Sequence, residues 1–442
     1  MQNPAAVPPA RPAINWRYRW QEDWSALADP ARRTDPFDAI KYIPLGSGAQ
    51  SYLSLGVTIR ERVDSVTLQL PPLRPDDYWL QRMQLHADLH AGSHLRVFTQ
   101  LVDARAAGKA PVGPADADRL DLEQGFVDVT FPAVRGSLRI RVGRHEPQLD
   151  LQRFADIRDG PNVRQPFDSA GADYTRKDSH LVVFYIRPVL TRDRAVFDDV
   201  SSGAFTVGGA RLEQRLGAGK LSVFFGQLRN EHALYLAAAG RERRDVLDVR
   251  HAGRRAGWDW DVEGMAQGGH VEVKTIRAWG VGGLVGHTAA LRHWSPRFGV
   301  QFDAASGTRS LNGNTVGTFN PLFPSGFYEL LAGYPGYANF AHVKASATLH
   351  PAKRLSTLFS GGLLWRETTD DAVYLLPAIP VTGTAGHGGA YSGAYAQIHL
   401  DWVLSPHATA ALDLEHFSHG ASLRPGDARG AHFIALELKL GI

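Results

Sequence analysis

The chain has 442 residues, a formal net charge of +3 and no cysteine. The lack of cysteine excludes disulfides, zinc–thiolate sites and thiol catalysis, and no stretch approaches the roughly eighteen consecutive apolar residues that a membrane-spanning helix needs. The 45 glycines and the many aromatic residues suit either a transmembrane β-barrel or a secreted β-protein.

The sequence of residues 1–13 predicts a flexible N-terminal segment. These residues are rich in proline and alanine and contain no apolar core of the kind that a signal peptide has. We interpret them as the start of a mature sequence from which the signal peptide has been removed. A cytoplasmic protein with a proline-rich tail is the alternative. No change in composition marks a linker further on, so residues 14–442 predict one large all-β unit.

Apolar and polar residues alternate through most of the remaining chain, which predicts strands with one face in water. The clearest candidates lie at 14–24, 51–62, 82–90, 258–267 and 396–402. About twenty such segments recur, many of them about nine to eleven residues long, which is the length of a tilted membrane strand. Almost no helical period lies between them, so a barrel with a water-filled interior explains the pattern economically.

The segment 135–168 is locally basic. It holds seven arginines, at positions 135, 139, 141, 144, 153, 158 and 164. Leu138, Ile140 and Val142 alternate with two of them, as in a strand with one wet face and one apolar face. A surface strand of a soluble protein could show the same alternation, so this segment alone does not distinguish a lipid-facing strand from a core-facing one.

Three turn-rich segments, 104–119, 307–338 and 369–390, predict long loops, whereas 176–179 and 218–219 predict short turns. Long extracellular loops and short periplasmic turns are expected of an outer-membrane barrel. The alternation continues to the last residue, as in the closing strand of such a barrel. Most bacterial outer-membrane proteins end in an aromatic residue, so Ile442 departs from that pattern.

Several short motifs along the chain resemble those of a known protein family. The first is Arg141-Val-Gly-Arg-His-Glu146, and the others follow at 153–164, 167–168, 305–309, 317–324, 364–370 and 416–420. In their order and spacing, from about residue 40 to the C-terminus, they resemble the bacterial alginate export family of outer-membrane β-barrels. The resemblance implies a monomeric barrel of about eighteen antiparallel strands with an arginine-rich constriction through which an anionic polysaccharide passes.

The resemblance also implies pore-lining residues. The matching positions are Arg60, Arg62, Arg141, Arg144, Arg153, Arg158, Arg164 and Arg366, with Asp168 as a carboxylate that could hold an arginine in place. The family often has glutamine where this chain has His145, and we favour a structural histidine there over a pH-dependent charge.

Arginine suits a constriction because guanidinium stays charged and binds a carboxylate through two parallel hydrogen bonds. A ring of such groups attracts polyanions, although each contact has to stay weak for a polymer to leave. The alternative is that the arginines pair with acidic residues and brace the wall and a folded-in loop. Acids such as Asp128 and Glu263 fall on the predicted lumen faces, so we expect a mixed lumen with a basic constriction.

These patterns favour a passive channel in the cell outer membrane over an enzyme. The chain has no His-Glu-x-x-His motif, no Gly-x-Ser-x-Gly motif and no basic patch with stacking aromatics, so we predict no catalytic residue, no metal or other cofactor and no nucleic-acid partner. Export of an alginate-like polysaccharide, with periplasmic and inner-membrane partners, is the first hypothesis. Uptake of acidic oligosaccharides or small organic anions is the second, because a barrel scaffold does not fix direction. A soluble secreted β-protein that binds or cleaves polyuronates is the third.

Overall fold

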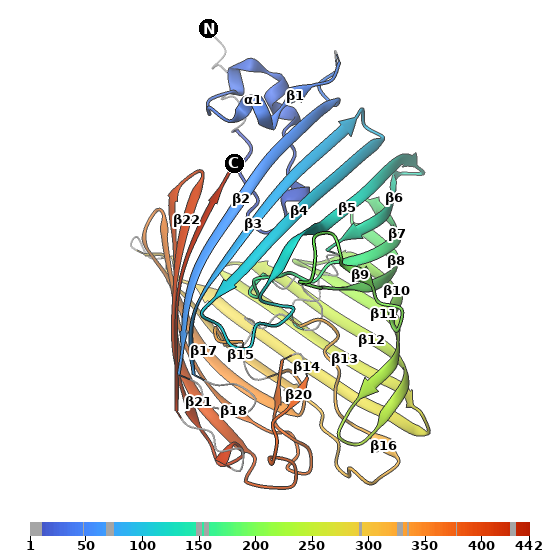
Figure 1. Cartoon of the computed structure of the whole chain (residues 1–442), viewed down its shortest axis with the longest axis vertical. Coiled ribbons are helices and arrows are strands. Elements are labelled where there is room, and N and C mark those ends of the chain that lie inside the picture. Colours follow the sequence, from blue (N-terminus) through green and yellow to red (C-terminus); the bar gives the residue numbers. More distant parts are fainter. Residues whose placement is uncertain are drawn as a thin grey trace.

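Strands form most of the chain and close into one antiparallel barrel (Figure 1). The computed structural model describes residues 11–442 except for 47, 68–74, 147–152, 154–158, 291–293, 325–329, 334–335, 377 and 425–429. Within these residues, eighteen long strands pair side by side in chain order, and the last pairs with the first. This confirms the predicted fold class, and the closure leaves no strand edge free.

The wall runs through two halves of nine strands each. The first half is β2 Tyr52–Val66, β3 Asp76–Ala91, β4 Leu95–Ala107, β5 Asp118–Ala133, β6 Gly136–His145, β7 Phe167–Arg176, β8 Ser179–Leu190, β10 Phe205–Leu216 and β11 Gly219–Leu234. The second half is β12 Ala239–Arg255, β13 Trp258–Val271, β14 Lys274–Thr288, β15 Arg297–Ala305, β17 Phe340–Ala352, β18 Leu355–Trp365, β21 Tyr391–Ser405, β22 Ala408–His419 and β23 Ala431–Gly441.

Shorter elements lie outside this wall. They are the 3-10 helices η1 Arg19–Gln21, η2 Ser25–Ala28 and η3 Pro30–Arg32, the helix α1 Asp38–Lys41, and the two-residue strands β1 Ile43–Pro44, β9 Val200–Ser201, β16 Thr315–Val316, β19 Tyr374–Leu375 and β20 Ile379–Pro380. None of the helices in the described part of the chain is long and apolar enough to cross a membrane.

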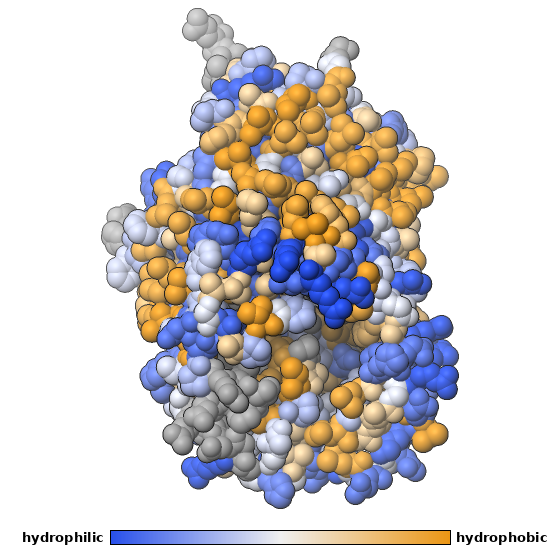
Figure 2. Space-filling view, in the orientation of Figure 1, coloured by the Kyte–Doolittle hydropathy of each residue, from blue (hydrophilic) through white to orange (hydrophobic). Residues whose placement is uncertain are grey.

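The alternating sequence pattern sets the two faces of the wall. On β23, Leu436 is 59% exposed on the outer face, whereas its neighbours Phe433 and Ala435 are buried. On β2, the polar positions Thr58 and Arg60 are buried inside the barrel. Apolar side chains gather over β2 to β6 in the upper part of Figure 2. The polar interior and apolar exterior are the reverse of a soluble protein, as a lipid-facing barrel requires.

The two ends of the barrel differ in their connections. At the end where α1 and the C-terminus lie, consecutive strands are joined by short turns such as 177–178 and 217–218. At the other end lie the long connections predicted from the sequence, between β4 and β5, between β15 and β17, and between β18 and β21. In outer-membrane barrels the short turns face the periplasm, so α1 and the C-terminus lie on the periplasmic side.

The prediction of a strand at residues 14–24 is wrong. This segment contains the helix η1 instead, and it packs inside the periplasmic end of the barrel. Trp20 lies edge-on to the inward-facing Phe126, with ring centroids 6.3 Å apart. β2 pairs with β3 along its whole length and with β23 over residues 58–66, and the short strand β1 takes the edge of β2 at Leu53 and Tyr52, so residues 14–24 find no wall strand to pair with. The predicted division of the chain at residue 13 stays a prediction.

Candidate substrate channel

The connection between β6 and β7 crosses the barrel interior. Its Arg153 forms ion pairs with Glu263 on β13, at 3.0 Å, and with Asp303 on β15, at 3.2 Å. Its Asp159 instead reaches Arg82 on β3, at 2.7 Å. Because β3 and β13 to β15 lie in different halves of the wall, the described parts of this connection span the lumen.

Three cations lie in one row across the inner wall. Arg60 of β2 is the register partner of Arg82 on β3 and of Lys439 on β23, so the three side chains share one level of the barrel. Arg60 and Arg82 are almost fully buried. Like charges directly opposite each other on neighbouring strands are destabilising, so this row requires anions beside it.

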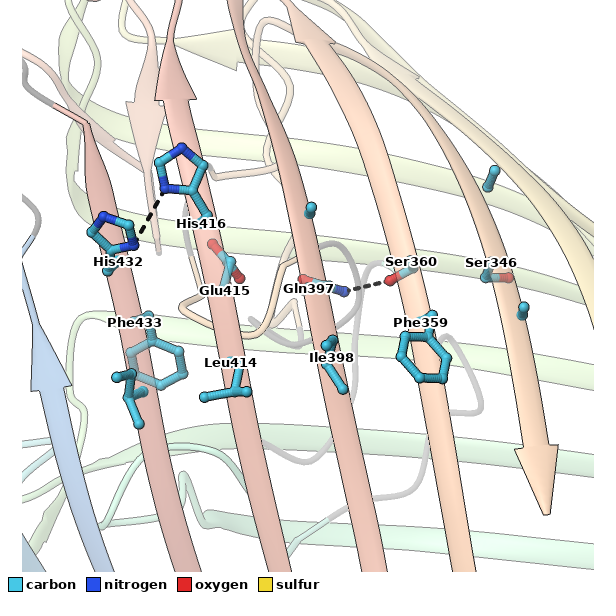
Figure 3. A pocket seen from close by; sticks show the side chains of 14 residues that line it. Ser346, Phe359, Ser360, Gln397, Ile398, Leu414, Glu415, His416, His432 and Phe433 are labelled. Carbon is cyan, nitrogen blue, oxygen red and sulfur yellow. Dashed lines mark hydrogen bonds between the residues drawn. The ribbon is translucent and has the colours of Figure 1, made fainter. Parts of the chain in front are cut away.

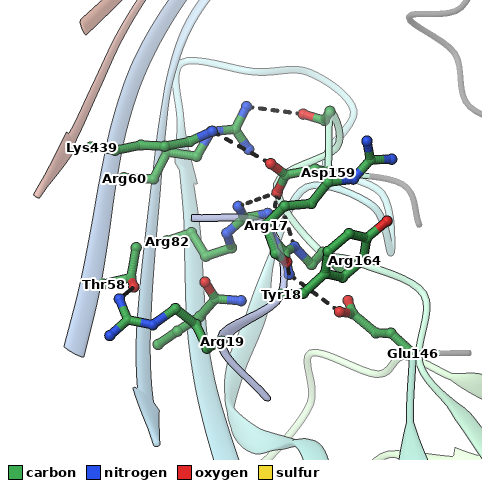
Figure 4. Close-up of polar contacts among 12 residues, drawn as sticks. Arg17, Tyr18, Arg19, Thr58, Arg60, Arg82, Glu146, Asp159, Arg164 and Lys439 are labelled. Carbon is green, nitrogen blue, oxygen red and sulfur yellow. Dashed lines mark hydrogen bonds and ion pairs between the residues drawn. The ribbon is translucent and has the colours of Figure 1, made fainter. Parts of the chain in front are cut away.

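The carboxylate of Asp159 is one of those anions (Figure 4). It accepts hydrogen bonds from Arg82 Nη2 at 2.7 Å and Arg164 Nη2 at 2.6 Å, and Lys439 Nζ lies 3.4 Å away. Arg60 donates to the backbone carbonyl of Gly160 at 3.0 Å. We call Arg60, Arg82, Asp159, Arg164 and Lys439 the Asp159 cluster.

The positive charges of the Asp159 cluster strongly favour a negatively charged group at its centre. Burial alone raises the pKa of the Asp159 carboxyl, but Arg164, Lys439 and Arg82 together lower that pKa well below its usual range. Two further anions lie beside the cations: Glu437, 2.5 Å from Arg60 Nε, and Glu146, 3.2 Å from Arg164 Nη1. Four cations therefore converge on a volume that a loop carboxylate occupies.

Arg60 and Arg164 are among the residues predicted from the sequence, whereas Arg82 and Lys439 are not. A signal for Arg82 was present, because it shares the polar phase of the predicted strand 82–90 with Gln84 and His86. The shared level of Arg60, Arg82 and Lys439 depends on the pairing register, which alternation in a single strand does not reveal.

Three further predicted residues are also paired. Arg62 donates to Asp64 at 2.6 Å, and Arg141 forms two hydrogen bonds of 2.6 Å with Asp128. Arg141 also lies 3.8 Å from the ring centroid of Phe126. His145 shares a 2.7 Å hydrogen bond with Ser169, as a structural histidine does.

Arg144 and Asp168 bind each other across β6 and β7. Arg144 Nε lies 2.9 Å from one oxygen of the Asp168 carboxylate and Nη2 lies 3.3 Å from the other. This ion pair joins two of the predicted residues, and the role of Asp168 in holding an arginine in place stays a prediction.

Arg366 serves a loop rather than an ion pair. Its guanidinium donates to six backbone carbonyls of the connection between β18 and β21, those of Thr369, Asp371, Thr384, His387, Gly388 and Gly389. This arginine therefore organises that long loop. The predicted Arg158 lies outside the described residues.

The N-terminal segment, residues 11–46 and 48–51, occupies the periplasmic end. Arg19 donates to Thr58 on β2 at 3.0 Å and to the carbonyl of Ile442 at 2.5 Å. Arg164 of the β6–β7 connection donates to the carbonyl of Arg17 at 3.0 Å. The segment that enters from the periplasmic end thus meets the connection that crosses the lumen.

The model of the alginate export family matches residues 51–436. The chain belongs to the alginate export family. This places the barrel in the outer membrane as a channel protein. No curated protein sequence matches the chain significantly.

Solved outer-membrane porins have the same fold as this alginate export family member. OccK11 (OpdR) of Pseudomonas aeruginosa is 14% identical with a TM-score of 0.57, over 88% of this chain and 96% of that one. A BenF-like porin of Pseudomonas fluorescens Pf-5 is 11% identical with a TM-score of 0.60, over 88% and 99%. OccK2 (OpdF) of Pseudomonas aeruginosa, solved in complex with glucuronate, is 11% identical with a TM-score of 0.56, over 88% and 96%. At these identities the likeness is one of fold.

One large hollow of this alginate export barrel lies away from the lumen. A groove of about 770 Å³ runs over β17, β18 and β21 to β23 (Figure 3). Phe359 and Ile434, which line it, are 41% and 48% exposed on the outer face. The groove therefore belongs to the lipid-facing surface and is not the conduit.

Proposed function

We propose that the chain is a passive channel for saccharides that carry carboxylates, with the Asp159 cluster as its constriction. Export of an alginate-like anionic polysaccharide is the first candidate. The observation that supports it best is the row of Arg60, Arg82 and Lys439 on three adjacent strands, closed by Arg164 from the crossing loop.

In this proposal the Asp159 carboxylate holds the place of a substrate carboxylate. A uronate that enters the lumen competes with Asp159 for Arg82 and Arg164, whose guanidinium groups can bind a carboxylate through two hydrogen bonds. Exchange between a loop carboxylate and a substrate carboxylate keeps the cations paired at each step. Each contact then stays weak enough for the substrate to move on, as conduction requires.

The remaining predicted residues form a mixed lumen in this account. Arg62, Arg141, Arg144, Arg153 and Arg158, with Asp168, are proposed to line it beside their acidic neighbours, and Arg366 to shape the loop above. We propose that the channel acts as a monomer in outer-membrane lipid, with no catalytic step and no cofactor, and that export would require periplasmic secretion partners.

Uptake of acidic oligosaccharides or small organic anions is the second candidate. The fold neighbour that was solved with glucuronate favours it, because glucuronate is a single acidic sugar. The neighbouring genes distinguish the two directions: a polymerase and acetylation enzymes favour export, whereas lyases or catabolic dehydrogenases favour uptake.

Liposome influx tests the carboxylate preference directly. Liposomes that contain the refolded protein should admit glucuronate faster than glucose, which is of similar size and neutral. Arg60→Gln combined with Arg82→Gln should remove most of this preference while glucose influx stays. Equal influx of the two sugars through the unaltered protein would contradict the proposal.

A further inference from the structure

A group of three acidic residues lies where the β8–β10 connection meets the start of β5. Asp118 and Asp121 are on β5, and Asp199 comes just before β9. One carboxylate oxygen from each of the three lies within 4.8 Å of the others. Asp118 is 1% exposed and Asp121 is 2% exposed. We call these three residues the aspartate trio.

The trio has less positive charge around it than its burial requires. Oδ1 of Asp118 is buried and has no hydrogen-bond partner among the described residues. Asp121 accepts hydrogen bonds from the backbone N–H groups of Leu122, at 2.6 Å, and of Asp199, at 3.1 Å. These neutral donors stabilise carboxylates but do not cancel their charge.

Within the described ranges, the arginine that forms an ion pair with the trio is Arg144. It lies 3.8 Å from Asp121 Oδ1, and it is already bound to Asp168 through two hydrogen bonds. Arg144 thus faces Asp121 as well as Asp168, and the described residues form no ion pair with Asp118 or Asp199. An unpaired buried carboxylate is costly, so the trio requires either a bound cation or a bound proton.

We propose that Asp118, Asp121 and Asp199 bind a divalent cation, Ca²⁺ by its chemistry. All the donor atoms are carboxylate oxygens, which hard cations prefer, and Ca²⁺ accepts flexible sets of six to eight oxygens that water can complete. The unpartnered Oδ1 of Asp118 supplies a ligand that no other group in the described structure uses.

Such an ion would bind the β8–β10 connection to the barrel wall. Asp199 belongs to the segment between β8 and β9, and the other two ligands belong to β5. The bound ion would hold this segment against β5, next to the Arg144 and Asp168 pair. The proposal does not depend on which substrate the channel carries.

Titration calorimetry on the refolded full chain in non-ionic detergent tests the site. After EDTA treatment and dialysis, Ca²⁺ should bind with about one equivalent per chain and should raise the temperature of unfolding. Asp118→Asn and Asp199→Asn should each weaken Ca²⁺ binding about tenfold or more, because each removes one charged ligand. Asp199 is partly exposed in a loop, so that variant is expected to fold even if Asp118→Asn does not.

Asp193→Asn is the matched control. Asp193 belongs to the same connection but pairs with Arg119 at 3.3 Å, outside the trio. This variant removes a nearby charge but no ligand, so it should weaken Ca²⁺ binding far less than Asp118→Asn or Asp199→Asn does. The proposal is overturned if the unaltered protein binds no Ca²⁺, or if Asp118→Asn raises the temperature of unfolding while Ca²⁺ has no effect, since a protonated carboxyl would then account for the trio.

Discussion

At the residue scale, Arg60, Arg82 and Lys439 lie at one level of the barrel wall. The stability of the fold alone does not explain this arrangement. Three neighbouring cations on adjacent strands repel each other, and their partners come from a crossing loop and from Glu437. A wall built only for stability would place acids directly opposite these bases. We therefore propose that the row is an anion site whose internal occupant, Asp159, a substrate can replace.

Arg82→Gln should weaken block of the channel by oligouronates about tenfold, which corresponds to about 1.4 kcal/mol for one lost charge-assisted contact. Block of ion current through single channels measures this. The matched control is Arg105→Gln on the neighbouring β4, because the Arg105 side chain is 49% exposed and pairs with Asp103. Equal losses in the two variants would argue against a specific role for Arg82.

Asp159→Asn should act in the opposite direction. It removes the internal carboxylate from Arg82, Arg164 and Lys439 while keeping the size of the side chain. The freed cations should then bind oligouronates more tightly and make the open channel more anion-selective. Reversal potentials in a salt gradient measure the selectivity, and a shift toward cations would contradict the competition between Asp159 and substrate.

Lys41 gives the N-terminal segment a pH dependence. Burial and the nearby Arg19 lower the pKa of the Lys41 ammonium to about 7, and Glu22 only partly opposes them. When the segment is undocked, the lysine keeps its ordinary pKa of 10.5, so above pH 7 the undocked state binds more protons than the docked state. Docking should therefore strengthen as the pH rises from about 7 toward 10.

Subtilisin cleavage of the N-terminal segment, normalised to a peptide substrate at each pH, measures this docking. Protection should increase with pH in the unaltered protein and should become independent of pH in Lys41→Met. The same pH profile in both proteins would show that another group is responsible.

At the element scale, two segments fill the lumen from opposite ends. The β6–β7 connection crosses it, and the N-terminal segment enters at the periplasmic end and meets that connection through Arg17 and Arg164. Trp20 is buried against Phe98 and Phe126 on the inner wall. The N-terminal segment is therefore placed to narrow the conduit.

Deletion of residues 1–41 should raise the single-channel conductance, because it removes side chains that occupy the periplasmic mouth. Deletion of residues 1–10 alone is the control, since all the contacts of Arg17, Arg19 and Trp20 remain. An unchanged conductance after the longer deletion would mean that the ion path avoids this segment.

The strands could be predicted from the sequence because alternation has one main physical cause, a wall with a wet face and an apolar face. Residues 14–24 show the limit of that argument. Trp16, Tyr18 and Trp20 alternate with arginines there, yet a closed barrel leaves them no strand to pair with, and Trp20 finds apolar contacts inside the lumen instead.

At the scale of the whole molecule, the small net charge is compatible with the proposed basic constriction. The net charge is only +3, and many lumen arginines have an acidic partner on a neighbouring strand or loop. The sequence could predict a mixed lumen from its composition. Which cations share one level depends on register and closure, and those pairings join residues as distant in the chain as Arg60 and Lys439.

We propose above all that this alginate export family barrel selects carboxylates at the Asp159 cluster. Planar-bilayer recording of the full chain tests it most directly, with a salt gradient to measure selectivity and added oligouronates to measure block. We predict anion selectivity and block by oligouronates, with no block by neutral oligosaccharides of the same length. Cation selectivity with no response to oligouronates would contradict the account.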